Sequence, residues 1–220
     1  LAICATLAYL YLATRSSLDE ANEHVRQLAN DTTVLGDARF SPVAATTAPR
    51  AAPDGVIEVL EWAVNRGNHY AFGAIALDDE RAALLTSLSE QLQQLDFAGT
   101  VAVDVHVGRF CMNRGAEGRL ELAPPNQPAA ACEQVGWTDS EAVALGQRQS
   151  IAFANAVASA SAHNPSVRVE SVSRGSGEPV VDYPAVNYEL AAGAWNSAAA
   201  ANQRVDIRLI APPADPGARR

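Results

Sequence analysis

Residues 140–209 constrain the fold more than any other stretch of the chain, because helix, strand, loop and strand patterns follow one another there without a break. In chain order we predict a capped helix over 140–162, a strand over 167–172, a loop over 174–179, a variable crossover and a last strand that begins with residues 202–209. A helix placed between strands in this way indicates an α+β arrangement, in which helices pack on a sheet.

The helix over 140–162 begins with a capping box, Thr-Asp-Ser-Glu at 138–141, and His-Asn-Pro at 163–165 ends it. We expect its buried side to consist of Ala144, Leu145, Ile151, Ala152, Phe153, Ala156 and Val157. In the last strand the apolar residues alternate with polar ones, at Val205, Ile207 and Leu209.

Upstream, residues 56–64 are apolar enough for a strand, and residues 66–75 indicate a loop. Asp78 then caps a helix whose apolar positions fall on one face: Ala82, Leu85, Leu88, Leu92 and Leu95. Residues 100–107 predict a half-buried strand, with Val101, Val103, Val105 and Val107 on one side and Ala102, Asp104 and His106 on the other. The predicted fold class is therefore α+β, with helices on one face of a mixed sheet.

Residues 108–137 form a long excursion rich in Gly, Pro and Asn, which we expect to be irregular. Cys111 and Cys132 flank it. In an oxidising compartment the two cysteines can join and close a loop of about 20 residues, worth roughly 3 kcal/mol; the alternative is two unpaired buried thiols. A metal site is not expected, because no histidine or third cysteine lies at ligand spacing.

The ends of the chain have their own patterns. Residues 1–14 are almost purely apolar and are shorter than the roughly 20 residues of a membrane helix. We interpret them as the outer half of a transmembrane helix, with the core of a signal peptide as the alternative. Residues 15–36 carry apolar positions at spacings of three and four, which favours a helical stalk that pairs with a copy or a partner. Residues 37–54 indicate a linker, 55–211 the folded domain and 212–220 a disordered tail.

Composition and motifs exclude several functions. The net charge of -9 argues against nucleic acid, since binding phosphates requires a basic face. Ser176 lies between two glycines and lacks the Gly-x-Ser-x-Gly pattern of a nucleophile elbow. No phosphate-binding glycine loop or nucleotide fingerprint occurs in the sequence. We therefore expect no enzymatic activity and no cofactor.

Five short motifs, in order, cover about two-thirds of the chain and resemble those of the OmpA-like (OmpA C-terminal, MotB-type) peptidoglycan-binding domain. They are Leu77 followed by a helix, Val-Asp-Val-His-Val-Gly at 103–108, Leu-Gly-Gln-Arg-Gln-Ser at 145–150, Gly-Ser-Gly-Glu-Pro at 175–179 and Asn-Gln-Arg-Val-Asp-Ile at 202–207. The second, third and fifth take the places of Gly-His-Thr-Asp, Leu-Ser-x-x-Arg-Ala and Asn-Arg-Arg-Val-Glu-Ile. The resemblance implies a βαβαββ sandwich.

The resemblance also implies a binding site, in which an aspartate takes the ammonium group of diaminopimelate and arginines take its carboxylates. Three positions depart from the pattern, because the aspartate's place falls on Gly108 and the two arginines' places fall on Gln149 and Gln203. His106 and Arg204 remain. The other positions of this implied site are Asn202 and Arg148, which is rotated by about 100° around the helix from Gln149.

Taken with the apolar start and the stalk, the resemblance implies a single-pass inner-membrane protein whose C-terminal domain lies in the periplasm. Such a protein would tether a MotB-like, stator-type complex to peptidoglycan, as in flagellar stators and the related Zorya motors. Its expected partners are peptidoglycan, an inner-membrane subunit and a second copy of the chain. The alternative is a degenerate OmpA-like domain that has lost the wall ligand and acts as a dimerisation or protein-interaction module.

Overall fold

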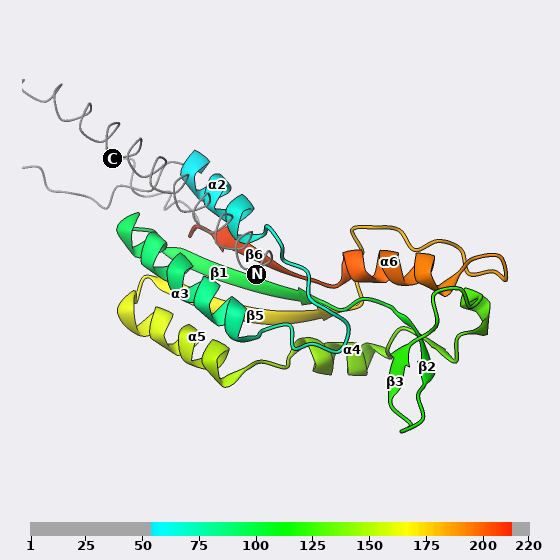
Figure 1. The fold of residues 1–220 in the computed structure, drawn as a ribbon. Helices are drawn as coiled ribbons and strands as arrows, with labels where there is room; N and C mark the ends of the chain where they lie inside the picture. The colour runs from blue at the N-terminus through cyan, green and yellow to red at the C-terminus, as the bar shows by residue number, and fades with distance from the viewer. Residues whose placement is uncertain (1–53, 213–220) are drawn as a thin grey trace, which may run out of the picture. The chain divides into compact units, whose positions relative to one another are not determined.

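A computed structural model describes residues 54–212 and confirms an α+β fold with a mixed sheet (Figure 1). The helices are α2 (Asp54–Val64), α3 (Asp79–Gln94), α4 (Asp139–Gly146), α5 (Ile151–His163) and α6 (Ala192–Asn202). The strands are β1 (Gly99–His106), β2 (Cys111–Arg114), β3 (Leu120–Leu122), β4 (Gln134–Val135), β5 (Val167–Gly175) and β6 (Arg204–Ile210), and a short 3-10 turn covers Ala129–Ala131.

The main sheet has three strands in the order β5-β1-β6. The central strand β1 runs parallel to β5 and antiparallel to β6, so that Val103 lies between Ser171 and Ile207. Side chains from α3, α5 and one face of these strands form the main core, including Leu85, Leu88, Leu92, Phe153, Val101, Val105 and Val205. Figure 1 shows α3 and α5 side by side on that face of the sheet.

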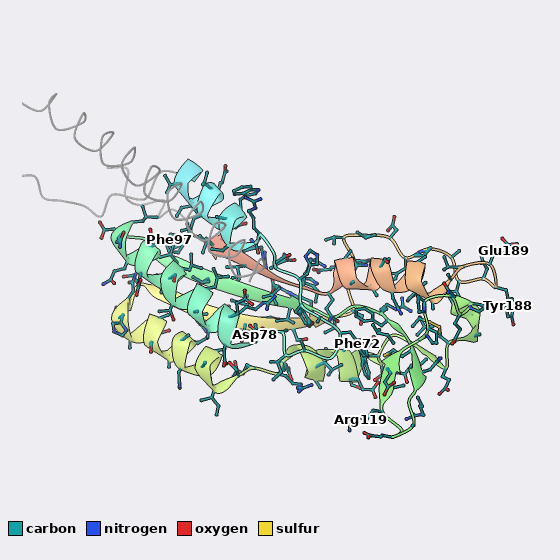
Figure 2. The ribbon with its side chains drawn as sticks, viewed as in Figure 1. Phe72, Asp78, Phe97, Arg119, Tyr188 and Glu189 are labelled. Carbon is teal, nitrogen blue, oxygen red and sulfur yellow. A yellow bond between two sulfur atoms is a disulfide. The ribbon has the colours of Figure 1, made fainter. Side chains whose placement is uncertain are left out.

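Helix α3 follows the sequence prediction closely. The Asp78 carboxylate accepts a hydrogen bond from the backbone N–H of Arg81 at 3.0 Å and thereby caps the helix. Figure 2 shows Asp78 at the start of the helix and Phe97 just beyond its other end. Leu85, Leu88 and Leu92 are fully buried, which stabilises the fold by roughly 1.5–3 kcal/mol for each side chain.

The predicted strand over 56–64 is wrong, because these residues form helix α2. Ile57, Leu60 and Val64 pack against the core at spacings of three and four, which is the period of a helix. The strand was predicted from the apolar content of the stretch alone, without regard to the spacing of its apolar residues. As a result, the domain begins with a helix where a strand was expected.

The segment from α2 to Tyr70 closes the edge of β6 that a further strand would otherwise occupy. The Asn65 side chain donates to the carbonyl oxygen of Ile207 at 2.7 Å and accepts from the Ile207 N–H at 2.8 Å. A carboxylate oxygen of Glu61 accepts from the Leu209 N–H at 2.9 Å, and the Asn68 carbonyl accepts from the Val205 N–H at 2.9 Å. Side chains and loop backbone thus satisfy donors and acceptors that a sheet edge leaves exposed.

The single helix predicted over 140–162 is two helices, α4 and α5, although the capping box at Thr138 and Glu141 is confirmed. Ser150 caps the second helix by accepting from the Phe153 N–H, and its own N–H donates to the Leu77 carbonyl at 2.8 Å. The break turns Ile151 outward, with 82% of it exposed, and Ala144 and Ala152 are exposed as well. An apolar count could not reveal this break, because both halves have helical composition.

The excursion at 108–137 is more regular than predicted. It carries a small antiparallel sheet of order β3-β2-β4, and the expected disulfide joins Cys111 to Cys132. Helix α6, which lies in the predicted crossover, packs on it through a second apolar cluster formed by Cys111, Ala123, Ala129, Ala192 and Trp195. Sequence reasoning missed α6, since its alanine-rich run has little contrast between its faces.

The predicted membrane segment (1–14), stalk (15–36), nearly all of the linker (37–54) and nearly all of the tail (212–220) lie outside the described residues. Within residues 54–212, no helix is both long enough and apolar enough to cross a membrane.

Candidate functional site

The face of the sheet opposite α3 and α5 is charged. Alternate residues of each strand point to this face, because successive side chains of a strand lie on opposite sides. Together with the loop after β5 they line a hollow of about 360 Å³. The lining residues are Asp104 and His106 from β1, Arg174 from β5, Glu178 from the loop, and Arg204, Asp206 and Arg208 from β6.

Asp104 lies at the centre of this charged hollow, between two arginines. Its carboxylate accepts from Arg174 Nε at 2.8 Å through one oxygen and from Arg208 Nε at 3.1 Å through the other. Burial opposes ionisation of Asp104, but the hydrogen bonds and positive charges of Arg208 and Arg174 outweigh it and hold the pKa below its usual range. Asp104 is therefore ionised at neutral pH and fixes both guanidinium groups.

Arg204 lies deeper, with only 8% of its side chain exposed. Its Nε donates to Asp206 at 2.8 Å, and its two terminal nitrogens donate to the carbonyl oxygens of Asn202 and Glu178 at 3.4 and 3.3 Å. His106 Nε2 lies 3.3 Å from the same Asp206 oxygen. A buried guanidinium with all three nitrogens engaged in this way holds the loop after β5 against β6.

Arg174 and Arg208 differ from Arg204, because 39% and 49% of their side chains are exposed. Arg174 contacts Asp104 through Nε, and Arg208 contacts it through Nε and one terminal nitrogen, so that other N–H donors of both guanidiniums have no contact with Asp104. Guanidinium donors in a hollow suit a carboxylate or a phosphate. Chemically, the charged hollow can bind an anion or a zwitterion. Within residues 54–212, no group of three or more metal-ligating side chains gathers.

The structure brings together His106 and Arg204 from the predicted site and uses two more predicted residues for folding. The Asn202 side chain accepts from the N–H groups of Val180 and Val181 at 2.8 and 2.9 Å and donates to the Val181 carbonyl. Gln203 is buried, and its side chain donates to the Tyr70 carbonyl at 3.0 Å. Both side chains hold segments of the fold in place and do not line the hollow.

The other three predicted residues lie elsewhere. Gly108 is packed against α6, where a Cβ atom would lie 2.3 Å from the carbonyl oxygen of Ala199. Arg148 and Gln149 are exposed in the turn between α4 and α5. That turn connects two helices, and neither residue lines the charged hollow.

Sequence reasoning missed Asp104, Arg174, Glu178, Asp206 and Arg208 as site residues. A signal was present in β6, where three charged residues recur at every second position from 204 to 208. The prediction of a half-buried strand over 100–107 is also corrected in part, because Asp104 and His106 on its polar side are only 5% and 3% exposed. The strand is buried on both faces near its end, since charged neighbours cover the polar side.

A second hollow, of about 380 Å³, lies between α2, the loop after it, and α3. Its lining includes Arg81, which donates to the carbonyl oxygens of Asn68 and His69 at 3.1 Å each. Arg81 is thus occupied in fixing the loop against α3. The charged hollow on the sheet remains the better candidate for binding.

The chain matches no protein-family model, and a search of curated proteins gives no match.

Proposed function

We propose that this chain is a membrane-anchored periplasmic protein whose folded part is a degenerate OmpA-like domain. In this proposal the domain acts as a dimerisation or protein-interaction module of an envelope complex and does not hold peptidoglycan through the site of that family. The observation that carries the proposal is the closure of the ligand positions at Gly108 and Gln203 by the fold itself.

The fold supports the resemblance in its second half. A strand (β1), a helical connection (α4 and α5), a parallel strand (β5), a crossover and an antiparallel strand (β6) follow in the expected order. The Gly-Ser-Gly-Glu-Pro motif begins at the end of β5, and the Asn-Gln-Arg-Val-Asp-Ile motif leads into β6. The first half departs from the family pattern, because α2 replaces the first strand.

The position of the family's aspartate supports the loss of the wall ligand. Gly108 occupies this position, and its surroundings leave no space for any side chain, because the backbone of α6 covers it. A restoring Gly108→Asp substitution would force α6 away from the sheet. The insertion of α6 thus accounts for both the glycine and the missing carboxylate.

The position of the helix arginine supports the same conclusion. In Leu-Ser-x-x-Arg-Ala, the serine is the residue type that caps a helix. Ser150 is the cap of α5, so the motif fits residues 149–154 better than residues 145–150. In this register Phe153 takes the arginine's place, and Phe153 is a core residue with 2% exposed.

The second candidate function is that of a peptidoglycan anchor, and the charged hollow favours it. Arg174 and Arg208 present exposed guanidinium groups, and Glu178 and Asp206 add carboxylates nearby. A zwitterionic stem peptide could bind there by charge-assisted hydrogen bonds of about 1.5–3 kcal/mol each. This candidate uses residues that differ from the family positions.

Co-sedimentation of the full chain with purified peptidoglycan sacculi distinguishes the two candidates. The double variant Arg174→Ala with Arg208→Ala removes both exposed guanidiniums of the hollow. The matched control Arg119→Ala removes an exposed guanidinium at the tip of the β2–β3 hairpin (Figure 2). We expect that none of the three proteins binds the sacculi in a way that free diaminopimelate reverses.

The opposite result has a specific form. If the native chain and the Arg119→Ala variant pellet, diaminopimelate releases them, and the double variant stays in solution, the anchor candidate is correct. In that case the domain holds the wall through its charged hollow, and our proposal is wrong.

A further inference from the structure

Strand β5 forms an open edge of the main sheet. Within residues 54–212 it pairs only with β1, whereas the opposite edge of the sheet, along β6, is closed by the segment that contains Asn65. Residues 168 and 170–172 are exposed, and 42% of Val172 is accessible. Such an edge presents a row of backbone N–H and C=O groups that can pair with another strand.

Two of the usual protections of an edge, proline and charges that point inward, are missing from β5. Its sequence contains no proline, and the residues on its core side, including Val169 and Ser171, carry no charge that would point inward. Its one irregularity lies near its end, where the register with β1 shifts between Val105 and His106. The stretch from Arg168 to Val172 is therefore regular and free to pair.

The charges on this stretch indicate the partner. Arg168 and Glu170 lie on the outer face of the sheet, two positions apart, and form an ion pair of 2.8 Å with 78% and 44% of their side chains exposed. In an antiparallel pair of two copies centred on Val169, residue 168 of one copy lies opposite residue 170 of the other. Each arginine then faces a glutamate, and the two-fold axis produces this contact twice.

Another self-complementary register would be centred on Val172 and would place Glu170 opposite Arg174. Two observations disfavour it. Arg174 is held by Asp104, and α4 lies against this end of the strand, since a Cβ atom at Gly175 would lie 3.4 Å from Val143. The register centred on Val169 avoids both, because it uses the part of β5 farther from α4.

We propose that two copies of this chain associate through β5, antiparallel and centred on Val169, so that their sheets join into one of six strands. The inference depends on the proposed function and deepens it, because it names the surface and the partner of the dimerisation module. A strand pair of this length buries less than the roughly 1,200 Å² of a standard interface. We therefore expect a weak contact, which a tether between the copies would strengthen.

The test uses the full chain with Cys4→Ser and Val169→Cys and measures disulfide-linked dimer after mild oxidation. In the proposed register the two Cα atoms of residue 169 lie about 4.5–5.5 Å apart, which a disulfide can span. We expect efficient cross-linking. Ser171→Cys in the same background is the control, because its two copies would lie roughly 13 Å apart and should not link.

Charge variants then test the pairing itself. Arg168→Glu alone and Glu170→Arg alone each place like charges opposite one another, and we expect each to lower cross-linking at residue 169 roughly tenfold. A mixture of the two variants restores opposite charges only between unlike chains, so that heterodimer should recover. The ion pair within each strand is broken in both variants, and the recovery therefore reports contact between chains. Arg119→Glu is the matched control for a change of charge and should have no effect.

Absence of a residue-169 cross-link in a chain that remains folded by tryptophan fluorescence would overturn the inference. Cross-linking at residue 171 with none at 169, or no recovery in the mixture, would also overturn it. Each of these results leaves the proposed function in place. Binding to sacculi that diaminopimelate reverses would refute the proposed function and would not affect the cross-link.

Discussion

At the scale of single residues, the charged face of the main sheet shows how position decides what a charged side chain does. Arg204 and Arg208 are four residues apart on β6, and both pair with an aspartate. Arg204 is buried and donates from all three nitrogens to the protein, so it acts as a structural residue. Arg208 is half-exposed and keeps donors for a ligand. Identical residue types in one strand thus have different roles, which only burial distinguishes.

Asp104 gives a prediction of pH dependence. Its pKa is lower in the folded state than in an unfolded chain, so its contribution to stability is present above about pH 4 and is lost as the pH falls through the folded value. We expect Asp104→Asn to lower the free energy of unfolding by about 1–2 kcal/mol at pH 7, since the two arginines stay partly solvated. Urea unfolding followed by tryptophan fluorescence measures this difference.

The acid limit provides the control for this prediction. At pH 3 and below, the difference between the native chain and Asp104→Asn should shrink, because the protonated carboxyl resembles the amide. Glu117→Gln, in the exposed pair with Arg119, should behave like the native chain throughout. A difference that stays constant from pH 7 to pH 2 would contradict the assigned role of Asp104.

Gly108 gives a prediction of steric cost. Gly108→Ala places a Cβ atom 2.3 Å from a backbone oxygen of α6, and we expect a loss of about 1–3 kcal/mol in the free energy of unfolding. Gly55→Ala is the matched control, because nothing lies within 4 Å of its added Cβ and the position is helical. The control should be neutral or slightly stabilising. Equal melting temperatures for the two variants would show that α6 can move away from Gly108.

At the scale of elements, the two edges of the main sheet are treated differently. The β6 edge is closed by side chains from α2 and the turn after it, with Glu61 and Asn65 making hydrogen bonds that a neighbouring strand would make. The β5 edge has no such cover within the described residues. In our proposal, this asymmetry directs association with a second copy of the chain to β5.

Asn65 gives a prediction at this scale. Asn65→Ala leaves the N–H and C=O groups of Ile207 without their partner, and we expect a loss of about 1–3 kcal/mol in the free energy of unfolding. Hydrogen exchange at the Ile207 amide should accelerate strongly. Asn65→Asp keeps the acceptor and should leave this amide slower than in the alanine variant. Unchanged exchange in Asn65→Ala would show that water replaces the side chain without cost.

At the scale of the whole described domain, the two larger of three apolar clusters support two parts of the fold. The main cluster lies between the sheet and helices α3 and α5, and the second lies between the disulfide-linked excursion and α6. The loop after β5 and the charged hollow lie on the opposite face of the sheet from the main cluster. Figure 2 shows Tyr188 and Glu189 at the far end of the crossover, away from α3.

Patterns among residues that are close together in the sequence determined much of this fold. The strand at β1, the alternation in β6, the apolar face of α3, and the caps at Asp78 and Thr138 all depend on residues close in sequence, and each was predicted correctly. The disulfide was predicted as well, because two cysteines flank one excursion. Local geometry alone fixes such features.

Tertiary structure decided the rest, because it depends on residues distant in sequence. The break at Ser150 requires Leu77, the closure of Gly108 requires Ala199, and the pKa of Asp104 requires arginines from two other strands. No window of sequence contains both members of these pairs. The residues of the charged hollow are therefore visible only once β1, β5 and β6 lie side by side.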